Sequence, residues 1–255
     1  MNKISRLAYL MGIYLFLYTP ILVLIVYSFN TANQSLIWQG FTWQWYAQLL
    51  ANKNLQIVAL HSLAVGFLAA TGATIIGTFA AASLYKYKFF GKKLIHGIIF
   101  ILIVSPDIVT GISLLVLFSA LKIPLGFWTL LLAHITFCVP FVTVTVYSRL
   151  VGSDKNIFEA AKDLGATDSI IFYRIMVPLL WPAIIAGWLL SFTLSMDDVV
   201  ISFFVTGPEF DVLPLKIFSM VRTGVKPEVN ALCSVMFGVT LGVVLLYRLV
   251  MPKEK

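Results

Sequence analysis

The chain has 255 residues, of which 60% are hydrophobic and 11% are charged, and its mean hydropathy is +0.96. A soluble domain carries about 25% charged residues, so a chain this apolar cannot cover a surface that faces water, and lipid must surround most of it. The net charge of +7 comes from Lys and Arg in short clusters between apolar runs, a pattern typical of membrane proteins, so we expect no nucleic-acid partner.

Six apolar segments follow one another along the chain, and each has at least the roughly 20 residues that a helix needs to cross a bilayer. They lie at about 8–29, 57–84, 94–121, 125–148, 179–205 and 229–250. The sequence therefore predicts an all-α fold, with residues 1–255 forming one polytopic bundle of six transmembrane helices. The first segment is too long for the apolar core of a cleaved signal peptide, so we expect it to be retained as a helix.

The distribution of basic residues predicts the orientation of these helices, because Lys and Arg in short connections stay on the cytoplasmic side. Thirteen of the 18 Lys and Arg residues lie at the two ends and in the second and fourth connections. The other five lie in the first, third and fifth connections. We therefore expect both termini in the cytoplasm.

The second segment carries small residues at every fourth position: Ala69, Ala73, Gly77 and Ala81. Small residues at this spacing form a shallow helix face that another backbone can approach closely. The stripe predicts tight helix packing and says nothing about a substrate.

The third segment contains a carboxylate, Asp107, directly after Ser105 and Pro106. An Asp near the bilayer centre costs about 2.5–3.5 kcal/mol, so it needs a partner or a watery path. Pro106 removes a backbone donor and can break the helix, and a broken helix at mid-membrane is a common substrate-site device. Asp107 is a candidate for the substrate pathway, with an internal pair or cap as the alternative.

The fourth connection, about 153–178, has a helical pattern. Ser153 or Asp154 can cap a first short helix. Its apolar residues recur on one face: Ile157, Phe158, Ala160, Ala161 and Leu164. Gly165 can end this helix in the left-handed conformation, and Thr167 can cap a second helix whose length Pro178 limits. The pattern predicts a compact helix–turn–helix on the cytoplasmic side.

This connection also carries a recognisable motif. Glu159-Ala160-Ala161 is followed four residues later by Gly165, then by nine residues, Ile175 and finally Pro178. The spacing resembles the EAA motif of type I ABC importer permeases, with a conservative departure at Val177, where the family usually has Leu. In that family the short helix docks in a groove of an ATPase subunit. The resemblance therefore implies ATPase coupling by Glu159, Ala160, Ala161, Gly165, Ile175 and Pro178.

The resemblance also implies the composition of the assembly. The expected partners are a second permease subunit, two ATPase subunits and a soluble periplasmic binding protein, besides the lipid of a bacterial inner membrane. The sequence has no GxxxxGK[ST] phosphate loop, so we expect no cofactor on this chain and no enzymatic activity of its own. ATP and Mg would bind the partner ATPase. The alternative for the short helix is an amphipathic helix lying on the membrane surface.

The fifth segment contains two adjacent carboxylates, Asp197 and Asp198. Neighbours on a helix point about 100° apart, so both cannot face one target equally. One can line the substrate pathway while the other caps a helix break or pairs with a basic group, and the sequence leaves open which does which. Carboxylates in a dry path favour a cationic substrate.

The finer substrate class comes from a second resemblance, which covers nearly the whole chain. The segments that carry it are WQGF (38–41), SPDIV (105–109), SFTLSMDDVV (191–200), TGP (206–208), LPLKI (213–217) and KPEVNAL (226–232). They look like the spermidine/putrescine permease family, which implies polyamine import. A permease of a putrescine-only system, or of an ABC importer for another solute, is the alternative.

Two further classes have less support. A membrane-embedded protease would need a Gly-x-Ser-x-Gly or HExxH motif, and neither is present. A proton-coupled transporter would suit the intramembrane acids, but the ATPase-docking motif argues against it. His61, His96 and His134 have no acid at helical spacing, so we expect them to pack or to hydrogen-bond a neighbouring helix.

Overall fold

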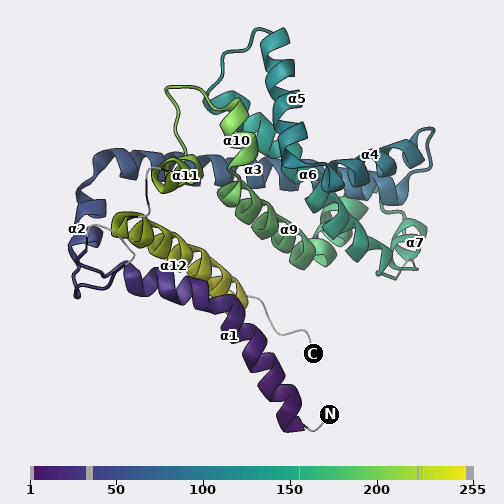
Figure 1. Ribbon diagram of the computed structural model, residues 1–255. Helices are drawn as coiled ribbons and strands as arrows, with labels where there is room; N and C mark the ends of the chain where they lie inside the picture. Colours follow the sequence, from purple (N-terminus) through teal and green to yellow (C-terminus); the bar gives the residue numbers. More distant parts are fainter. Residues whose placement is uncertain (1–2, 33–36, 155, 223, 225, 251–255) are drawn as a thin grey trace. The chain divides into compact units, whose positions relative to one another are not determined.

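The computed structural model describes residues 3–32, 37–154, 156–222, 224 and 226–250. Across these residues the secondary structure is helical, apart from one isolated bridge between Asn30 and Phe41, so the predicted all-α class is confirmed. The elements, labelled in Figure 1 except for α8 and η1, are α1 Lys3–Tyr27, α2 Gln44–Ala51, α3 Lys53–Lys86, α4 Lys92–Val104, α5 Asp107–Ala120, α6 Phe127–Val151, α7 Asn156–Asp163, α8 Asp168–Ile170, the π-helix η1 Ile171–Met176, α9 Val177–Asp197, α10 Val200–Val205, α11 Leu213–Arg222 and α12 Pro227–Val250.

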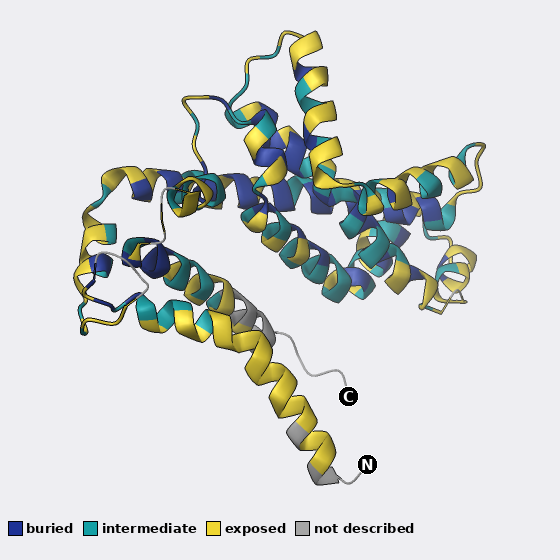
Figure 2. Cartoon of the chain, in the orientation of Figure 1, coloured by how far each residue is buried: buried dark blue, intermediate teal, exposed yellow. Residues whose placement is uncertain are grey.

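The chain divides into two compact units, residues 60–214 and residues 1–59 together with 215–255. In the unit that holds both ends of the chain, α1 and α12 lie side by side, and α2 contacts α12 (Figure 1). The apolar side chains of α1 are almost all exposed, as Figure 2 shows, and Phe16 is 80% exposed. A helix that is apolar all round is stable only where lipid or another chain covers it.

The core of the other unit lies between α3, α6 and α9. The small-residue stripe of α3 faces this core: Ala69, Ala73 and Ala81 are fully buried. A Cβ added at Gly77 would stand 2.7 Å from the side chain of Val142 on α6. The predicted close packing of this stripe is therefore confirmed.

The third apolar segment is broken where the proline predicts it. Ser105 and Pro106 are extended, and the axes of α4 and α5 differ by 111° across them. The second arm, α5, packs on α10, where Gly111 allows close approach: a Cβ at that position would lie 2.8 Å from the ring of Phe204. Residues 94–121 are thus two helices that meet at an angle.

The fifth apolar segment also differs from the expectation of one helix over 179–205. The helix begins earlier, at Asp168, runs through the π-turn η1 into α9, and ends at Asp197. Asp198 is extended, and α10 follows as a separate short helix. The sequence predicted that Pro178 limits the length of the second short helix, but the helix continues through this residue. Pro178 stands in the first turn of α9, directly after the wider π-turn, where a missing N–H is tolerated.

In the described residues, four helices are long and apolar enough to cross a membrane: α1 from Ser5, α3, α6 and the helix Asp168–Asp197. The bent pair α4–α5 makes a fifth if it is counted as one span. Helix α12 covers the whole of the sixth predicted segment. The number of six spans and the cytoplasmic location of both termini remain predictions.

Candidate functional site

The motif-bearing connection folds as a short helix, a turn and a second helix. The amide of Asn156 donates to the Asp154 carboxylate at 2.9 Å at the start of α7, as expected for a capping residue. At its end Gly165 has φ +81°, and the amide of Ala166 donates to the carbonyl of Ala161 at 3.0 Å. This bond pattern closes a helix over a left-handed glycine and reverses the chain. The predicted turn at Gly165 is present.

The second helix of this connection is capped and tied to α3. The Thr167 hydroxyl accepts from the Ile170 amide at 3.4 Å, which confirms the predicted N-cap. Next to it, the Asp168 carboxylate lies 2.6 Å from the ammonium of Lys86, the last residue of α3. Lys86 and Asp168 border a surface cavity of about 260 Å³ between the end of α3 and the π-turn.

The α7 helix turns one side inward and leaves the other exposed. Phe158 packs against the core between α3, α6 and α9, and Ala161 is buried. Glu159 and Ala160 are exposed. The sequence placed Ile157, Ala160 and Leu164 on the same face as Phe158, but the structure exposes all three. Leu164 is 89% exposed because it lies at the turn, past the end of α7. The exposed side of α7 can therefore meet another protein.

The remaining motif residues lie at the base of the fifth segment. Ile175 is half-buried within the π-turn, and Pro178 is exposed at the start of α9. The helix from Asp168 to Asp197 is continuous, so one helix joins the short helix–turn–helix to Asp197.

The three carboxylates in the predicted spans lie at helix breaks and differ in exposure. Asp107 is the first residue of α5, directly after the proline break, and it is exposed. Asp197 is the last residue of α9 and is also exposed. Asp198, which follows it, is 8% exposed. The break within 179–205 thus separates two neighbouring acids into an accessible one and a buried one.

Asp198 caps the short helix α10. Its carboxylate accepts the amide of Ile201 at 3.1 Å and both the amide and the hydroxyl of Ser202, at 2.7 and 2.8 Å. These first amides of α10 have no acceptor inside that helix, and an unpaired donor is costly in an apolar surrounding. The sequence left open which of Asp197 and Asp198 caps a helix break, and in the structure Asp198 is the capping residue.

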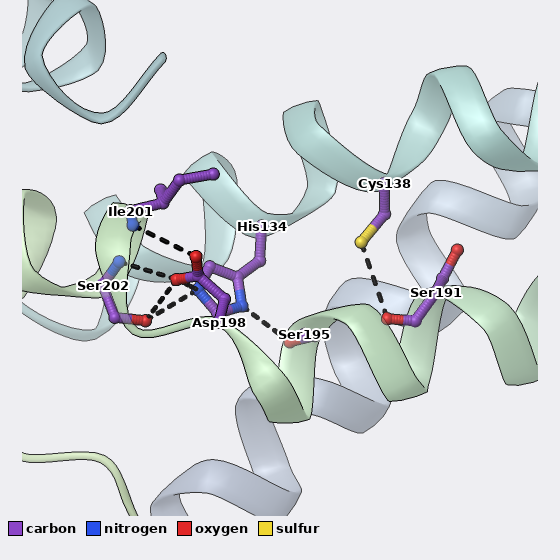
Figure 3. A network of polar contacts seen from close by, with 7 residues as sticks. All are labelled: His134, Cys138, Ser191, Ser195, Asp198, Ile201 and Ser202. Atoms are coloured by element: carbon purple, nitrogen blue, oxygen red, sulfur yellow. Dashed lines mark hydrogen bonds and ion pairs between the residues drawn. The ribbon is translucent and has the colours of Figure 1, made fainter. Parts of the chain in front are cut away.

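A buried histidine completes this network, shown in Figure 3. His134 of α6 places Nδ1 2.6 Å from the Ser195 hydroxyl, and Nε2 3.0 Å from the Ser202 hydroxyl and 3.4 Å from the Asp198 carboxylate. The expectation that His134 hydrogen-bonds a neighbouring helix is confirmed. Its pairing with Asp198 was missed, because the two residues stand far apart in the sequence and only the packing of α6 on α9 and α10 brings them together. The one hint in the sequence was that His134 and Asp198 are polar residues inside apolar segments, where each needs a partner.

The rest of the site contains no metal cluster or reactive thiol pair in the part of the chain that the structure describes. No group of three His, Cys, Asp or Glu side chains there could hold a metal ion. Cys138 is buried and its thiol lies 3.6 Å from the Ser191 carbonyl (Figure 3), while Cys233 is also free. The arrangement provides exposed carboxylates at two breaks and a short helix with an exposed side, while the serine hydroxyls beside His134 are buried.

Comparison with known proteins agrees with these features. Residues 73–253 match a family model described as "Binding-protein-dependent transport system inner membrane component". The chain is 53% identical to the spermidine/putrescine transport system permease protein PotC of Escherichia coli (strain K12), over 98% of this chain and 94% of that protein. It is 44% identical to the putrescine transport system permease protein PotI of the same strain, over 91% of this chain and 85% of that protein.

A solved structure shares the fold. A bacterial ABC transporter involved in the import of the acidic polysaccharide alginate matches with a TM-score of 0.70 at 17% identity, over 98% of this chain and 97% of that chain. At this identity the likeness concerns the arrangement of helices alone.

Proposed function

Because the chain belongs to the family of binding-protein-dependent transport system inner membrane components, we propose that it is the permease subunit of an ATP-driven importer of polyamines. The observation that carries the substrate class is the 53% identity to a spermidine/putrescine permease along almost the whole of both chains. The exposed carboxylates Asp107 and Asp197 support it, because polyamines are polycations and an apolar pathway favours cations only where acids line it.

The helix–turn–helix at 153–178 is proposed to receive the ATPase. Glu159 and Ala160 lie on its exposed side, where a carboxylate can pair with a basic group and an alanine leaves room for close docking. Gly165 reverses the chain, and Ala161, Ile175 and Pro178 link the docking helix to the core and to α9. Closure of the ATPase would then move the helix Asp168–Asp197 and the acid at its far end.

The proposed assembly has two different permease subunits around one pore, two ATPase subunits and a periplasmic polyamine-binding protein, set in the bacterial inner membrane. ATP and Mg would bind the ATPase subunits, since this sequence has no phosphate loop. The apolar, exposed surface of α1 supports a location in lipid or against the second permease.

A second substrate assignment has its own support. The chain is 44% identical to a putrescine permease over 85% of that protein, so a preference for putrescine over spermidine is the alternative within the same transporter class.

Uptake of labelled spermidine and putrescine tests the proposal. The chain is expressed with its partner subunits in cells that lack polyamine importers of their own. We expect ATP-dependent uptake that prefers spermidine. A preference for putrescine would select the alternative, and a complex that assembles and hydrolyses ATP without importing either amine would overturn the polyamine assignment.

The coupling role is tested in the same cells with Glu159→Lys. Charge reversal on the exposed side of α7 should abolish uptake while the protein stays in the membrane, because Glu159 makes no contribution to the core. Lys88→Glu, an exposed charge reversal outside the connection, is the control and should leave uptake unchanged. Full transport by Glu159→Lys would contradict the coupling role.

A further inference from the structure

One imidazole holds both sides of the break in the fifth segment. Through its two nitrogens His134 reaches Ser195 in the last turn of α9, Asp198 in the break and Ser202 in the first turn of α10 (Figure 3). All four side chains are buried, and His134 is 2% exposed. Buried hydrogen bonds in an apolar surrounding are strong and costly to lose, so this ring fixes the geometry of the break.

The short helix α10 is held to α6 at its other end as well. The hydroxyl of Thr129, one of the first residues of α6, donates to the carbonyl of Val205, the last residue of α10, at 2.9 Å. Helix α6 is therefore hydrogen-bonded to α10 near both ends of α10, and His134 also bonds to α9.

Each ring nitrogen of His134 has a hydrogen-bond partner in this network. Both ring nitrogens face hydroxyls, and a hydroxyl can either donate or accept. The Ser202 hydroxyl already donates to Asp198, so it accepts from Nε2–H of His134, whereas the Ser195 hydroxyl can donate to Nδ1 or accept from it. No other side chain type can place two such nitrogens on opposite sides of one flat ring.

The orientation of Asp197 depends on these contacts of His134 with α9, the break and α10. Asp197 is the last residue of α9 and is exposed, whereas Asp198 is turned inward by its bonds to α10 and His134. A continuous helix through this point would rotate each side chain by about 100° from the last and would not keep one acid buried under a cap. The break therefore decides which carboxylate is accessible.

We infer that His134 is a positioning residue for cation passage: by bridging α9, the break and α10, it keeps the break open and Asp197 presented to the pathway. The inference rests on the proposed function, since it assigns a supporting residue to the same pathway. His134 itself is buried and would not touch the substrate.

Accessibility of position 197 tests the inference without any transport. In the assembled complex, Asp197→Cys is combined with Cys138→Ala and Cys233→Ala, and the rate of labelling by a charged thiosulfonate reagent is measured. Adding His134→Leu should lower this rate at least about tenfold, the factor that one hydrogen bond to a charged group corresponds to. His96→Leu, on α4, is the control and should leave the rate unchanged. An unchanged rate with His134→Leu would overturn the inference.

Transport in the chain with its native Asp197 and cysteines gives the second readout. With His134→Leu, spermidine imported per ATP hydrolysed should fall at least about tenfold, and His134→Gln, which can keep one of the hydrogen bonds, should recover part of it. A role limited to stability would lower the amount of complex and leave the ratio in each assembled complex unchanged, which would also overturn the inference.

A variant that removes fewer contacts is tested if the complex with His134→Leu does not assemble. Ser195→Ala removes only the bond from α9 to the ring and leaves the pair with Asp198. It should lower both the labelling rate and the transport ratio, and no change in either would contradict the inference. If the complex with native His134 imports no polyamine, the proposed function fails, and the labelling rate still decides the role of His134.

Discussion

Asp197 and Asp198 are neighbours with opposite environments. Asp198 is 8% exposed and receives three hydrogen bonds from Ile201 and Ser202, whereas Asp197 is exposed. A buried carboxylate that accepts several donors stabilises the fold, while an exposed acid at a helix break is free to meet a cation from the pathway. The two residues should therefore respond differently to substitution.

Asp198→Ala should destabilise the protein, because it leaves the buried amides of Ile201 and Ser202 without an acceptor, at about 1–3 kcal/mol for each. Asp197→Asn should leave stability unchanged and lower polyamine uptake. The unfolding temperature of the purified complex in detergent and the uptake rate in cells separate the two effects. Equal stability of the two variants would show that the cap contributes nothing to the fold.

At the scale of elements, the core of residues 60–214 depends on the close approach of α3 to α6. Gly77 lies in the small-residue stripe of α3 against Val142, and the contact leaves no room for a side chain. The stripe is a packing surface that lets α3 lie close to α6, the helix that carries His134.

Gly77→Val should destabilise the protein by about 1–3 kcal/mol, the usual cost of overpacking a core. The matched control is Gly97→Val on α4, where nothing stands within 4 Å of the added Cβ. Thermal unfolding of the detergent-purified complex measures both. If Gly77→Val unfolds at the same temperature as Gly97→Val, the contact between α3 and α6 adapts and is not tight.

At the scale of the whole molecule, the chain is a membrane component with exposed apolar helices, and its sequence predicts that the energy for transport comes from a partner subunit. Phe16 on α1 and Phe203 on α10 are mostly exposed, and such surfaces need lipid or a partner subunit. Intramembrane acids alone would also suit proton coupling, so the source of energy distinguishes the two transporter classes.

Uptake by the reconstituted complex should need ATP on the ATPase side of the membrane and no proton gradient. In proteoliposomes that hold ATP in the lumen and receive the binding protein outside, spermidine should accumulate at the same rate with and without a protonophore. Accumulation that stops when the protonophore is added would instead assign the chain to proton-coupled transport.

Much of the protein was predictable from the sequence because the features concerned are local. Apolar segments longer than a bilayer, the proline break at Ser105–Pro106, the left-handed turn at Gly165 and the cap at Thr167 each depend on residues within one or two helical turns. The motif at 159–178 and the family segments identified the class of transporter for the same reason, since spacing along the chain is itself the signal.

Tertiary structure decided what depends on distant residues. Nothing local to Asp198 shows that His134 pairs with it, and only the packing of α6 against α9 and α10 places the ring beside the break. The same packing determines that Asp198 is buried and Asp197 exposed, and that the helix of the fifth segment ends at Asp197 and not at 205. A helix break inside an apolar segment is stable only when its free amides and its acid find partners, and those partners come from other parts of the chain.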